Sequence, residues 1–455
     1  MIHENVSAVT DRSSIDDLVH TAVFSSDAAA KAEARKQIHL RARKVGAIPS
    51  SIYPLYQAFG RNEIKERFTV PAFNIRAITY DTARALFRAA MRNDVGPFIF
   101  EIARSEIGYT EQRPAEYAAC ILAAAIAEGY KGPVFIQGDH FQASAKKWAT
   151  PEGKAAEVKA LESLMDEAIA AEFYNIDIDT STLVDLKYET RDEQQSENYL
   201  YTAHFTKHIR SKQPKGIEIS IGGEIGEVGK YNTKPDEVRA YMNGLRKHLG
   251  DVPGIAKISV QTGTSHGGVP MADGTIAEAK IDFDVLREVT DICRNEYGVG
   301  GSVQHGASTL SEAVFNKFPE SNAVEIHLAT GFQNMVLDAP SLPAEMKERI
   351  RVFCFENCAD ERKSGETDEQ FVYKSRKKAI GPFKKEMWHM DAAAKQPIVD
   401  ALEKKFEFLM NKLGVFGTRD LLLKYVPANP ADLPEYKGAS DELSKAATVD
   451  PNEGE

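Results

Sequence analysis

Residues 133–142 read PVFIQGDHFQ, a short apolar run that ends in two adjacent ionisable residues, Asp139 and His140. Seven other runs of the same kind occur along the chain. Each is rich in valine, isoleucine and phenylalanine and is bounded by glycine, proline or aspartate, as buried parallel strands are. The other runs cover residues 68–75, 97–102, 173–179, 216–223, 256–263, 301–306 and 323–329.

Segments of helical character separate most of these runs, for example DTARALFRAAMRN (81–93) and EVKALESLMDEAIAAE (157–172). Strands that alternate with helices in this way predict an α/β fold, and eight of them in succession predict a (β/α)8 TIM barrel. An open, doubly wound sheet is the alternative. It is less favoured because no G-x-G-x-x-G motif follows the first predicted strand.

The barrel is expected over residues 67–338. Residues 1–66 are predicted to form a helical N-terminal extension, and residues 339–426 further helices that pack on the barrel or at an oligomer interface. The tail, residues 427–455, is acidic, contains several prolines and has few large apolar residues, so we expect it to be partly disordered.

Composition limits the classes of partner. The 455 residues are 43% hydrophobic and 27% charged, with a net charge of −11, which argues against a nucleic-acid partner. No apolar run approaches the ~20 residues of a membrane span. The N-terminus resembles neither a signal peptide nor a transit peptide, and the four cysteines are too few and scattered for a disulfide framework. A cytoplasmic protein is therefore expected.

Polar residues stand at or just after the ends of the predicted strands. The active sites of TIM barrels lie at the C-terminal ends of the strands, where the loops converge. We therefore expect these side chains to lie close together. In chain order they are Asn74, Ser105, Asp139, His140, Asp177, Asp179, Glu224, His266, His305 and His327.

Three of these residues suggest a metal site. A single histidine at a strand end is more often structural, but His140, His266 and His305 end three strands of one predicted barrel. Three neutral imidazoles leave an open coordination position, as in catalytic metal sites. We expect one divalent metal ion here, with zinc favoured and cobalt, manganese or iron as alternatives.

Small residues beside these histidines suggest a phosphate site. Gly267 follows His266, Gly306 and Ser308 follow His305, and Thr330 lies in the ATG turn at 329–331. Free backbone N–H groups in such turns bind anions. The alternative is that the glycines only allow tight turns. Arg376, in YKSRKK, is a further candidate phosphate ligand across an interface, unless it belongs to a solvated basic run.

Over about residues 66–390 the chain resembles the class II, metal-dependent fructose- and tagatose-bisphosphate aldolases. VPAFNI resembles the opening strand of that family, GDHFQ its Asp–His pair, GTSHG and QHGAS its other metal histidines, and ATG its last phosphate loop. The resemblance implies a homodimer or homotetramer that binds zinc or a similar ion, acts on a phosphorylated sugar and admits a monovalent cation. It also implies that Asp139 moves protons at the C4 hydroxyl of a ketose.

The same resemblance makes Glu224 either a residue that contacts the metal ligands or an alternative metal ligand, and it makes Asp179 the acid of the fourth strand. Asn74 and Ser105 are candidate substrate or phosphate ligands. His327 stands where the family has an asparagine that touches the enediolate, so it is a candidate catalytic residue. The expected reaction is reversible cleavage of a phosphorylated ketose through a metal-stabilised enediolate, with the metal as Lewis acid.

Two other functions remain open. The lysine that commonly follows the second metal histidine in the family is missing from HGGVPMADG (266–274), which makes a metal-dependent ketose or keto-acid epimerase credible. The segment EIARSEIGYTEQRP (101–114) resembles the partner subunit of tagatose-bisphosphate aldolase. A non-catalytic aldolase partner is therefore the third function considered.

Overall fold

The computed structural model describes residues 12–225, 231–263, 281–308, 310–429 and 433–438. Its centre is a closed parallel barrel, in which each strand pairs with the next and the last pairs back to the first. The prediction of a (β/α)8 barrel is thus confirmed, and the open sheet is excluded. The eight strands are β2 (Val70–Asn74), β3 (Ile99–Ala103), β4 (Gly132–Gln142), β5 (Asn175–Asp179), β6 (Ser220–Glu224), β7 (Lys257–Val260), β8 (Ser302–Gln304) and β9 (Glu325–Leu328).

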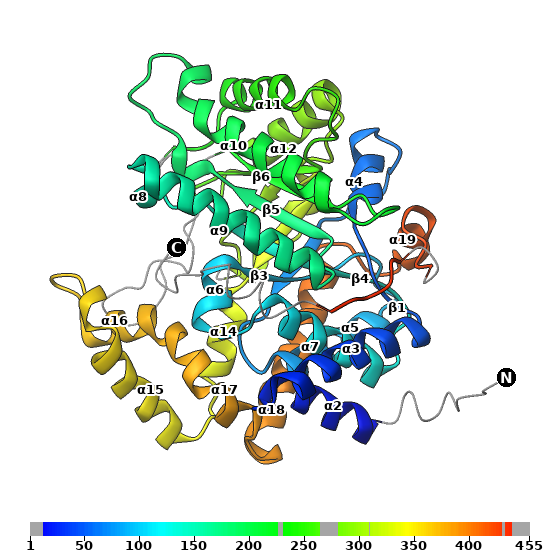
Figure 1. Cartoon of the computed structure of the whole chain (residues 1–455), viewed down its shortest axis with the longest axis vertical. Coiled ribbons are helices and arrows are strands. Elements are labelled where there is room, and N and C mark those ends of the chain that lie inside the picture. The colour runs from blue at the N-terminus through cyan, green and yellow to red at the C-terminus, as the bar shows by residue number, and fades with distance from the viewer. Residues whose placement is uncertain (1–11, 226–230, 264–280, 309, 430–432, 439–455) are drawn as a thin grey trace.

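Helices surround this barrel (Figure 1). Those between the strands are α5 (Thr79–Arg92), α6 (Arg104–Tyr109), α7 (Pro114–Glu128), α8 (Ala145–Trp148), α9 (Pro151–Ala170), α10 (Arg191–Lys212), α11 (Pro235–Leu249), α12 (Phe283–Ile292) and α13 (Lys317–Glu320). After β9 come α14 (Thr330–Leu337), α15 (Ala344–Asn357), α16 (Asp368–Ser375), α17 (Ile380–Trp388), α18 (Ala392–Lys412) and α19 (Arg419–Tyr425).

Polar and apolar side chains alternate along several barrel strands, and both kinds are buried. Successive side chains of a strand point to opposite faces of the sheet. In β5, Ile176 and Ile178 alternate with Asp177 and Asp179, and all four are buried. By the same alternation, Glu101 on β3, Lys257 on β7, and Glu325 and His327 on β9 are buried polar residues next to apolar ones. Because Lys257 on β7 contacts Glu325 on β9 and Asp177 on β5, these polar side chains point toward the barrel axis. The apolar side chains of the same strands face the helices.

The N-terminal segment contains helices α2 (Arg12–Phe24), α3 (Ala28–Val45) and α4 (Tyr53–Gly60). It also contains a strand that was not predicted, β1 (Ala47–Pro49), which pairs with the first residues of β4. From α4, the fully buried Tyr56 hydroxyl donates to Glu325 on β9. This segment therefore contributes a side chain to the interior of the barrel.

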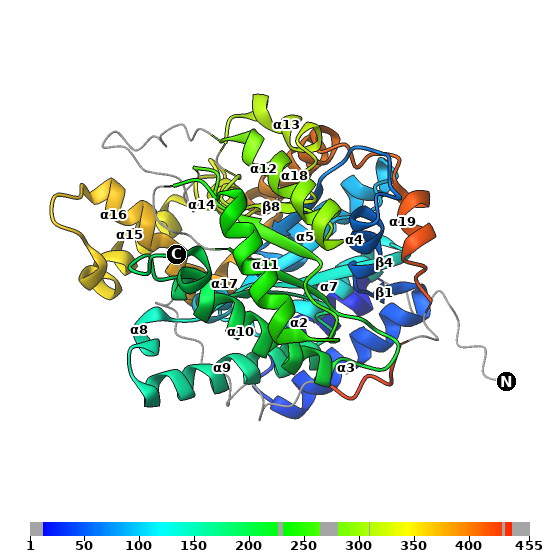
Figure 2. The ribbon, with the colours of Figure 1, turned by 90° about the horizontal axis from the view of Figure 1, so that it is seen from above.

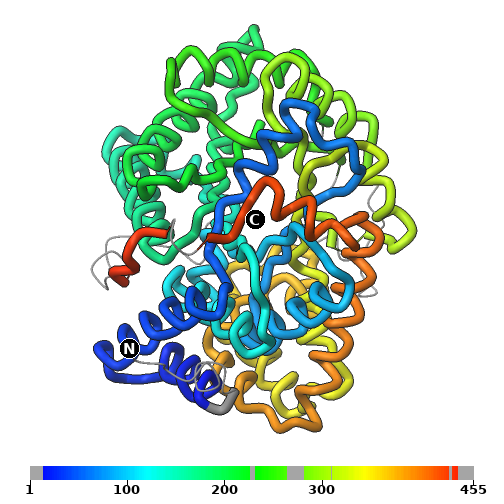
Figure 3. Tube along the Cα trace, turned by 90° about the vertical axis from the view of Figure 1, so that its right-hand side faces the viewer, coloured from blue at the N-terminus to red at the C-terminus, as the bar shows by residue number. Residues whose placement is uncertain are grey.

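The outer helices pack on two sides of α5 and α7. The α2–α3 pair lies against α7, where Arg35 is 3.4 Å from Glu116, and α18 lies against α5, where Arg92 is 3.0 Å from Glu407 (Figure 3). Phe406 of α18 also packs on Phe73 of β2, with ring centroids 5.1 Å apart. The last helices therefore complete the outer layer of the barrel beside its first strand.

Helices α15 and α16 extend away from the barrel (Figures 1 and 2). They enclose a small apolar cluster of their own, made of Cys354, Cys358 and Phe371. Near the C-terminus, Tyr436 stacks on the buried His39 of α3, with ring centroids 3.8 Å apart. Most of the tail for which we expected partial disorder lies outside the described residues. Among the helices that the structure does describe, none is long and apolar enough to span a bilayer.

Candidate active site

A backbone irregularity brings Asp139 and His140 into the barrel together. Adjacent residues of a regular strand face opposite sides, so they cannot both point inward. The pairing of β4 with β5 shifts register between Gly138 and Phe141, and His140 has a φ of +39°. A β-bulge of this kind redirects side chains next to active sites. It explains how the sequence GDH can place two consecutive ionisable groups at one centre.

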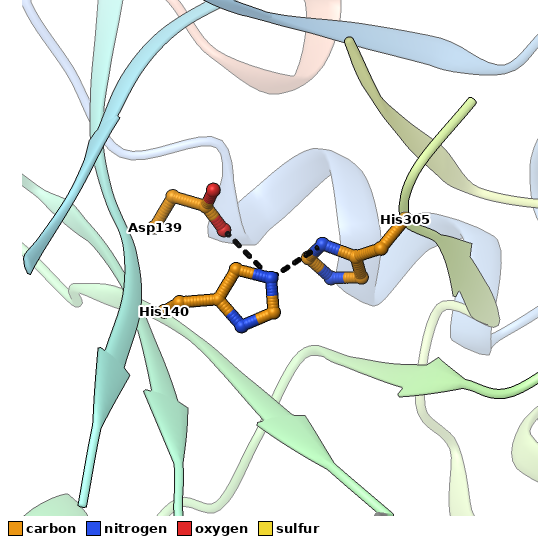
Figure 4. A group of neighbouring side chains, drawn as sticks. All are labelled: Asp139, His140 and His305. Atoms are coloured by element: carbon orange, nitrogen blue, oxygen red, sulfur yellow. Dashed lines mark hydrogen bonds and ion pairs between the residues drawn. The ribbon is translucent and has the colours of Figure 1, made fainter. Parts of the chain in front are cut away.

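His140 and His305 face each other at this centre. Nε2 of His140 is 2.8 Å from Nδ1 of His305 and 3.8 Å from Oδ1 of Asp139 (Figure 4). On the other edge of the His140 ring, Nδ1 is 2.8 Å from Glu224 and 3.1 Å from Asp179. The structure thus brings together predicted residues from three strands, β4, β5 and β6, and from the segment after β8. His266 and Gly267 lie outside the described residues.

The electrostatics of this group suit a cation. Burial, and then the charge of Asp179, raise the pKa of Glu224 to about 7. Burial alone would lower the pKa of His140, but the nearby Glu224 and Asp139 raise it well above the ordinary value. Among the described residues, the buried Oε1 of Glu224 accepts no hydrogen bond of good geometry, although Nδ1 of His140 lies 2.8 Å from it as an ion-pair partner. Imidazole and carboxylate ligands fit a borderline divalent metal such as zinc, which would relieve the crowding of negative charge.

Ligand atoms of four sets of described side chains lie close enough to hold such an ion. Two sets share His140: Asp139 with His140 and His305, and His140 with Asp179 and Glu224. The other two share His327: Glu101 with Asp139 and His327, and Asp177 with Glu325 and His327. The sets that share His140 contain the predicted metal residues, with Glu224 as an alternative ligand. Oγ of Ser259 lies 2.8 Å from Nε2 of His305, and the hydrogen bond between these two atoms fixes the orientation of the His305 ring.

A second polar layer lies next to this centre. Nζ of Lys257 is 2.9 Å from Asp177 and 2.8 Å from the side-chain oxygen of Gln137, and it also pairs with Glu325. Burial and the charge of Asp139 raise the pKa of Glu101 to about 8. Glu101, Gln137, Lys257 and Glu325 were not among the predicted site residues. Gln137 and Glu325 stand two positions before Asp139 and His327, and this spacing was the signal for them. Glu101 and Lys257 are charged residues inside apolar runs, which was the signal for these two.

His327 connects the two layers. Its Nδ1 lies 3.1 Å from Oδ1 of Asp139, and its Nε2 lies 2.6 Å from Oε1 of Glu325. The ring is 3% exposed, and its centroid is 4.0 Å from that of His305. The residue at the position of the family's asparagine therefore has both ring nitrogens in contact with carboxylates.

The predicted phosphate residues of the last two strands lie side by side. Gly306, with a φ of +66°, follows β8, and Thr330 begins α14 after β9. The backbone N–H of Gly331 donates to Oγ of Ser308 at 3.0 Å. A side chain on Gly331 would place its Cβ 2.6 Å from the carbonyl oxygen of Ser308. The two turns are therefore packed closely together at the C-terminal end of the barrel.

The remaining predicted residues are engaged within the protein. The Asn74 amide donates to Glu106 at 2.7 Å and accepts from Arg76 at 3.2 Å. Ser105 is buried in the first turn of α6. Arg376 pairs with Asp338 and donates to Asn334, at 2.8 Å, near the C-terminal end of α14. These contacts hold the loops around the centre in place.

The barrel, its bulge and the histidine–carboxylate centre with its candidate metal ligands are the features expected of a TIM barrel of the class II aldolase type. The family model of class-II fructose-bisphosphate aldolase matches residues 58–409, and the chain belongs to this family. No functionally curated protein matches the sequence significantly.

Solved structures share the fold at low sequence identity. The glycerol complex of the fructuronate-tagaturonate epimerase UxaE from Cohnella laeviribosi has a TM-score of 0.58 at 11% identity, over 87% of this chain and 90% of its own. A probable tagatose 6 phosphate kinase from Sinorhizobium meliloti 1021 has a TM-score of 0.51 at 13% identity, over 83% and 99%. Identities this low carry the fold and no particular activity.

Proposed function

We propose that the protein is a metal-dependent aldolase that reversibly cleaves a phosphorylated ketose of the fructose- or tagatose-bisphosphate type. The observation that carries the proposal is the position of Asp139, beside the facing rings of His140 and His305. Family membership supports the same reaction class. Zinc is the proposed metal, with cobalt, manganese or iron as alternatives and a monovalent cation as an accessory ion.

His140, His266 and His305 would hold the divalent ion, with Glu224 as an alternative ligand and Asp179 orienting His140 from 3.1 Å. The bound ion would supply Lewis-acid polarisation of the substrate's carbonyl oxygen. Asp139 would accept the proton of the C4 hydroxyl as the C3–C4 bond breaks, which is general base catalysis. In the reverse direction Asp139 would return that proton to the C4 oxygen.

The turns after β8 and β9 would bind the phosphate. Backbone N–H groups around Gly306 and at the start of α14, with the hydroxyls of Ser308 and Thr330, supply donors, and a helix N-terminus favours an anion. Binding there would fix the position of the reacting carbons relative to Asp139. Asn74, Ser105 and Arg376 remain proposed substrate or phosphate ligands. Their present contacts would have to rearrange in the complex.

A chelator-controlled substrate screen tests the proposal. The purified protein is stripped of metal, reconstituted with zinc, cobalt, manganese or ferrous ion, and given fructose or tagatose bisphosphate. Triose formation is followed with a coupled dehydrogenase. We expect activity only in the reconstituted samples. Full activity in the stripped sample would refute the metal-dependent reaction.

A ketose or keto-acid epimerase is the second candidate. Two carboxylates, Asp139 and Glu224, approach opposite edges of the His140 ring, an arrangement that suits proton transfer on two sides of a substrate. His327, at the position of the family's asparagine, also distinguishes this chain within the family. Incubation with one ketose discriminates between the two, because a new stereoisomer without triose supports the epimerase.

A non-catalytic partner subunit is the third candidate. Metal analysis of the purified protein tests this candidate, since such a subunit need not retain a stoichiometric ion.

We further propose a cytoplasmic homodimer or homotetramer, with 67–338 as catalytic barrel, 1–66 as N-terminal extension and 339–426 as the region for oligomer contacts. All four cysteines are free and buried, which suits a reducing compartment.

A further inference from the structure

His327 is held on both sides by carboxylates. Nδ1 lies 3.1 Å from Oδ1 of Asp139 and 3.0 Å from Oε2 of Glu101, and Nε2 lies 2.6 Å from Oε1 of Glu325. Asp139, the proposed base, and Glu325, which pairs with Lys257, are carboxylates that only accept hydrogen bonds, so the ring nitrogen that faces each of them acts as the donor. Both nitrogens are therefore used within the protein. A substrate oxygen can reach neither without breaking one of these contacts.

Glu325, which orients the ring, is itself fixed by several donors. Gln137 Nε2 donates to Oε1 of Glu325 at 3.1 Å, Lys257 pairs with the same oxygen, and the hydroxyl of Tyr56 donates to the other oxygen. The carboxylate is fully buried. Such multiple contacts leave it one orientation, and a fixed carboxylate that holds one imidazole nitrogen determines the direction of the other.

We propose that His327 is a positioning residue, which holds the Asp139 carboxylate in its working orientation and is itself oriented by Glu325. This role rests on the proposed function, in which Asp139 moves the proton at C4. It assigns to His327 a task different from that of the family's asparagine, because His327 acts through Asp139 and does not touch the substrate. A general base works only within hydrogen-bond reach of its proton, so an error in its position lowers the rate.

Two substitutions of His327 separate the two contacts of the ring. In His327→Asn the amide group can occupy the place of Nδ1, so the contact with Asp139 is kept and that with Glu325 is lost. In His327→Gln the longer side chain places its amide near Nε2, so the contact with Glu325 is kept and that with Asp139 is lost. Both variants remove the ring, so its packing is lost in each.

We expect the asparagine variant to retain a kcat at least about tenfold above that of the glutamine variant, with similar KM values, because a lost positioning contact costs about 10- to 100-fold. Equal kcat values, or a faster glutamine variant, would overturn the proposal. Metal content and thermal unfolding of both variants show whether each is folded and loaded.

Glu325→Gln has a matched control elsewhere in the chain. Glu172 is a buried carboxylate 2.5 Å from Nδ1 of the buried His39, and it lies outside the proposed site. We expect Glu325→Gln to lower kcat about 10- to 100-fold with KM changed less than about threefold, and Glu172→Gln to change neither. Equal losses in the two variants would show that Glu325 acts only on stability.

Nitrogen-15 NMR of protein labelled at histidine tests the contacts without any substrate, with His327→Asn used to assign the resonance. We expect both ring nitrogens of His327 to carry protons in the metal-loaded protein. A metal-bound Nδ1, together with a second divalent ion per chain, would overturn the proposal, because Glu101, Asp139 and His327 would then be ligands. If the wild-type protein converts no ketose, the proposed function fails, while the NMR result still decides whether His327 holds Asp139.

Discussion

Lys257→Met removes the positive charge from the barrel interior at nearly constant side-chain volume. Lys257 is 1% exposed and pairs with Asp177 and Glu325, both of which are also buried. Removing one partner of a buried ion pair leaves an uncompensated charge and costs about 3–5 kcal/mol. The substitution should therefore lower the folding equilibrium constant by roughly two to four powers of ten at neutral pH.

The pH dependence of this loss has a definite sign. Burial alone would raise the pKa of Glu325, but Lys257 and His327 lower it to about 2. In the wild type, ionised Glu325 therefore stabilises the fold at pH values above its ordinary pKa, and this stabilisation is lost only in strong acid. Burial already raises the pKa of Asp177 to about 6 in the wild type, against the lowering effect of Lys257. Without Lys257, burial should raise the pKa of Asp177 further and raise that of Glu325 above its value in the unfolded chain. Stability of the variant is then lost as the pH rises through those raised values, so the deficit should be larger at pH ~8 than at pH ~5.5.

Urea unfolding followed by tryptophan fluorescence measures the effect, with recovery of the signal on dilution as the check of reversibility. Lys187→Met is the matched control, because Lys187 is 91% exposed and its Nζ lies 3.9 Å from Asp185. That exposed pair should contribute less than about 1 kcal/mol. A loss below about 1 kcal/mol for Lys257→Met at pH ~8, or a deficit that grows as the pH falls, would refute this account of the interior.

Three further outcomes are expected. Asp139→Asn should lower kcat by roughly 10²–10⁴, the range for loss of a general base, with zinc content unchanged in a metal assay. Gly331→Ala should raise KM for the phosphorylated ketose while leaving cleavage of an unphosphorylated analogue little changed, because its Cβ would lie 2.6 Å from the carbonyl oxygen of Ser308 and move the turn. Glu224→Gln should weaken zinc binding about 10- to 100-fold in a competition titration with a chelating dye, and an unchanged affinity would exclude Glu224 as a ligand or support for one.

The barrel could be predicted because its strands are short apolar runs with clear boundaries, repeated eight times. Strand β1 could not be predicted, because Ala47–Pro49 is only three residues long, contains proline and shows no alternation of polar and apolar residues. Its place depends on β4, which begins at Gly132, several residues before its neighbour β3 engages it at Phe135. A strand that exists only because a distant strand is long leaves no signal in its own residues.

At the site, the residues at the strand ends could be predicted because the barrel fold brings those ends together. The second layer was missed because the runs were interpreted as uniformly apolar. FIFEIA and AVEIHLA each carry a charged residue two positions before a strand-end residue, a period of two that points Glu101 and Glu325 to the same side as the residues that follow. The bulge at His140 could not be predicted from the sequence either, because it is a shift in the pairing of β4 with β5.

The hydroxyl of Tyr56 has a consequence for how this chain can be shortened. It comes from a helix that precedes the first barrel strand, yet it supplies a donor to the carboxylate that orients His327. A protein begun at residue 67, where the sequence suggests a natural start for the barrel, would leave a buried acceptor without its donor, at a cost of about 1–3 kcal/mol. For any effort to graft this active centre onto a smaller scaffold, the leading helix is part of the minimum unit.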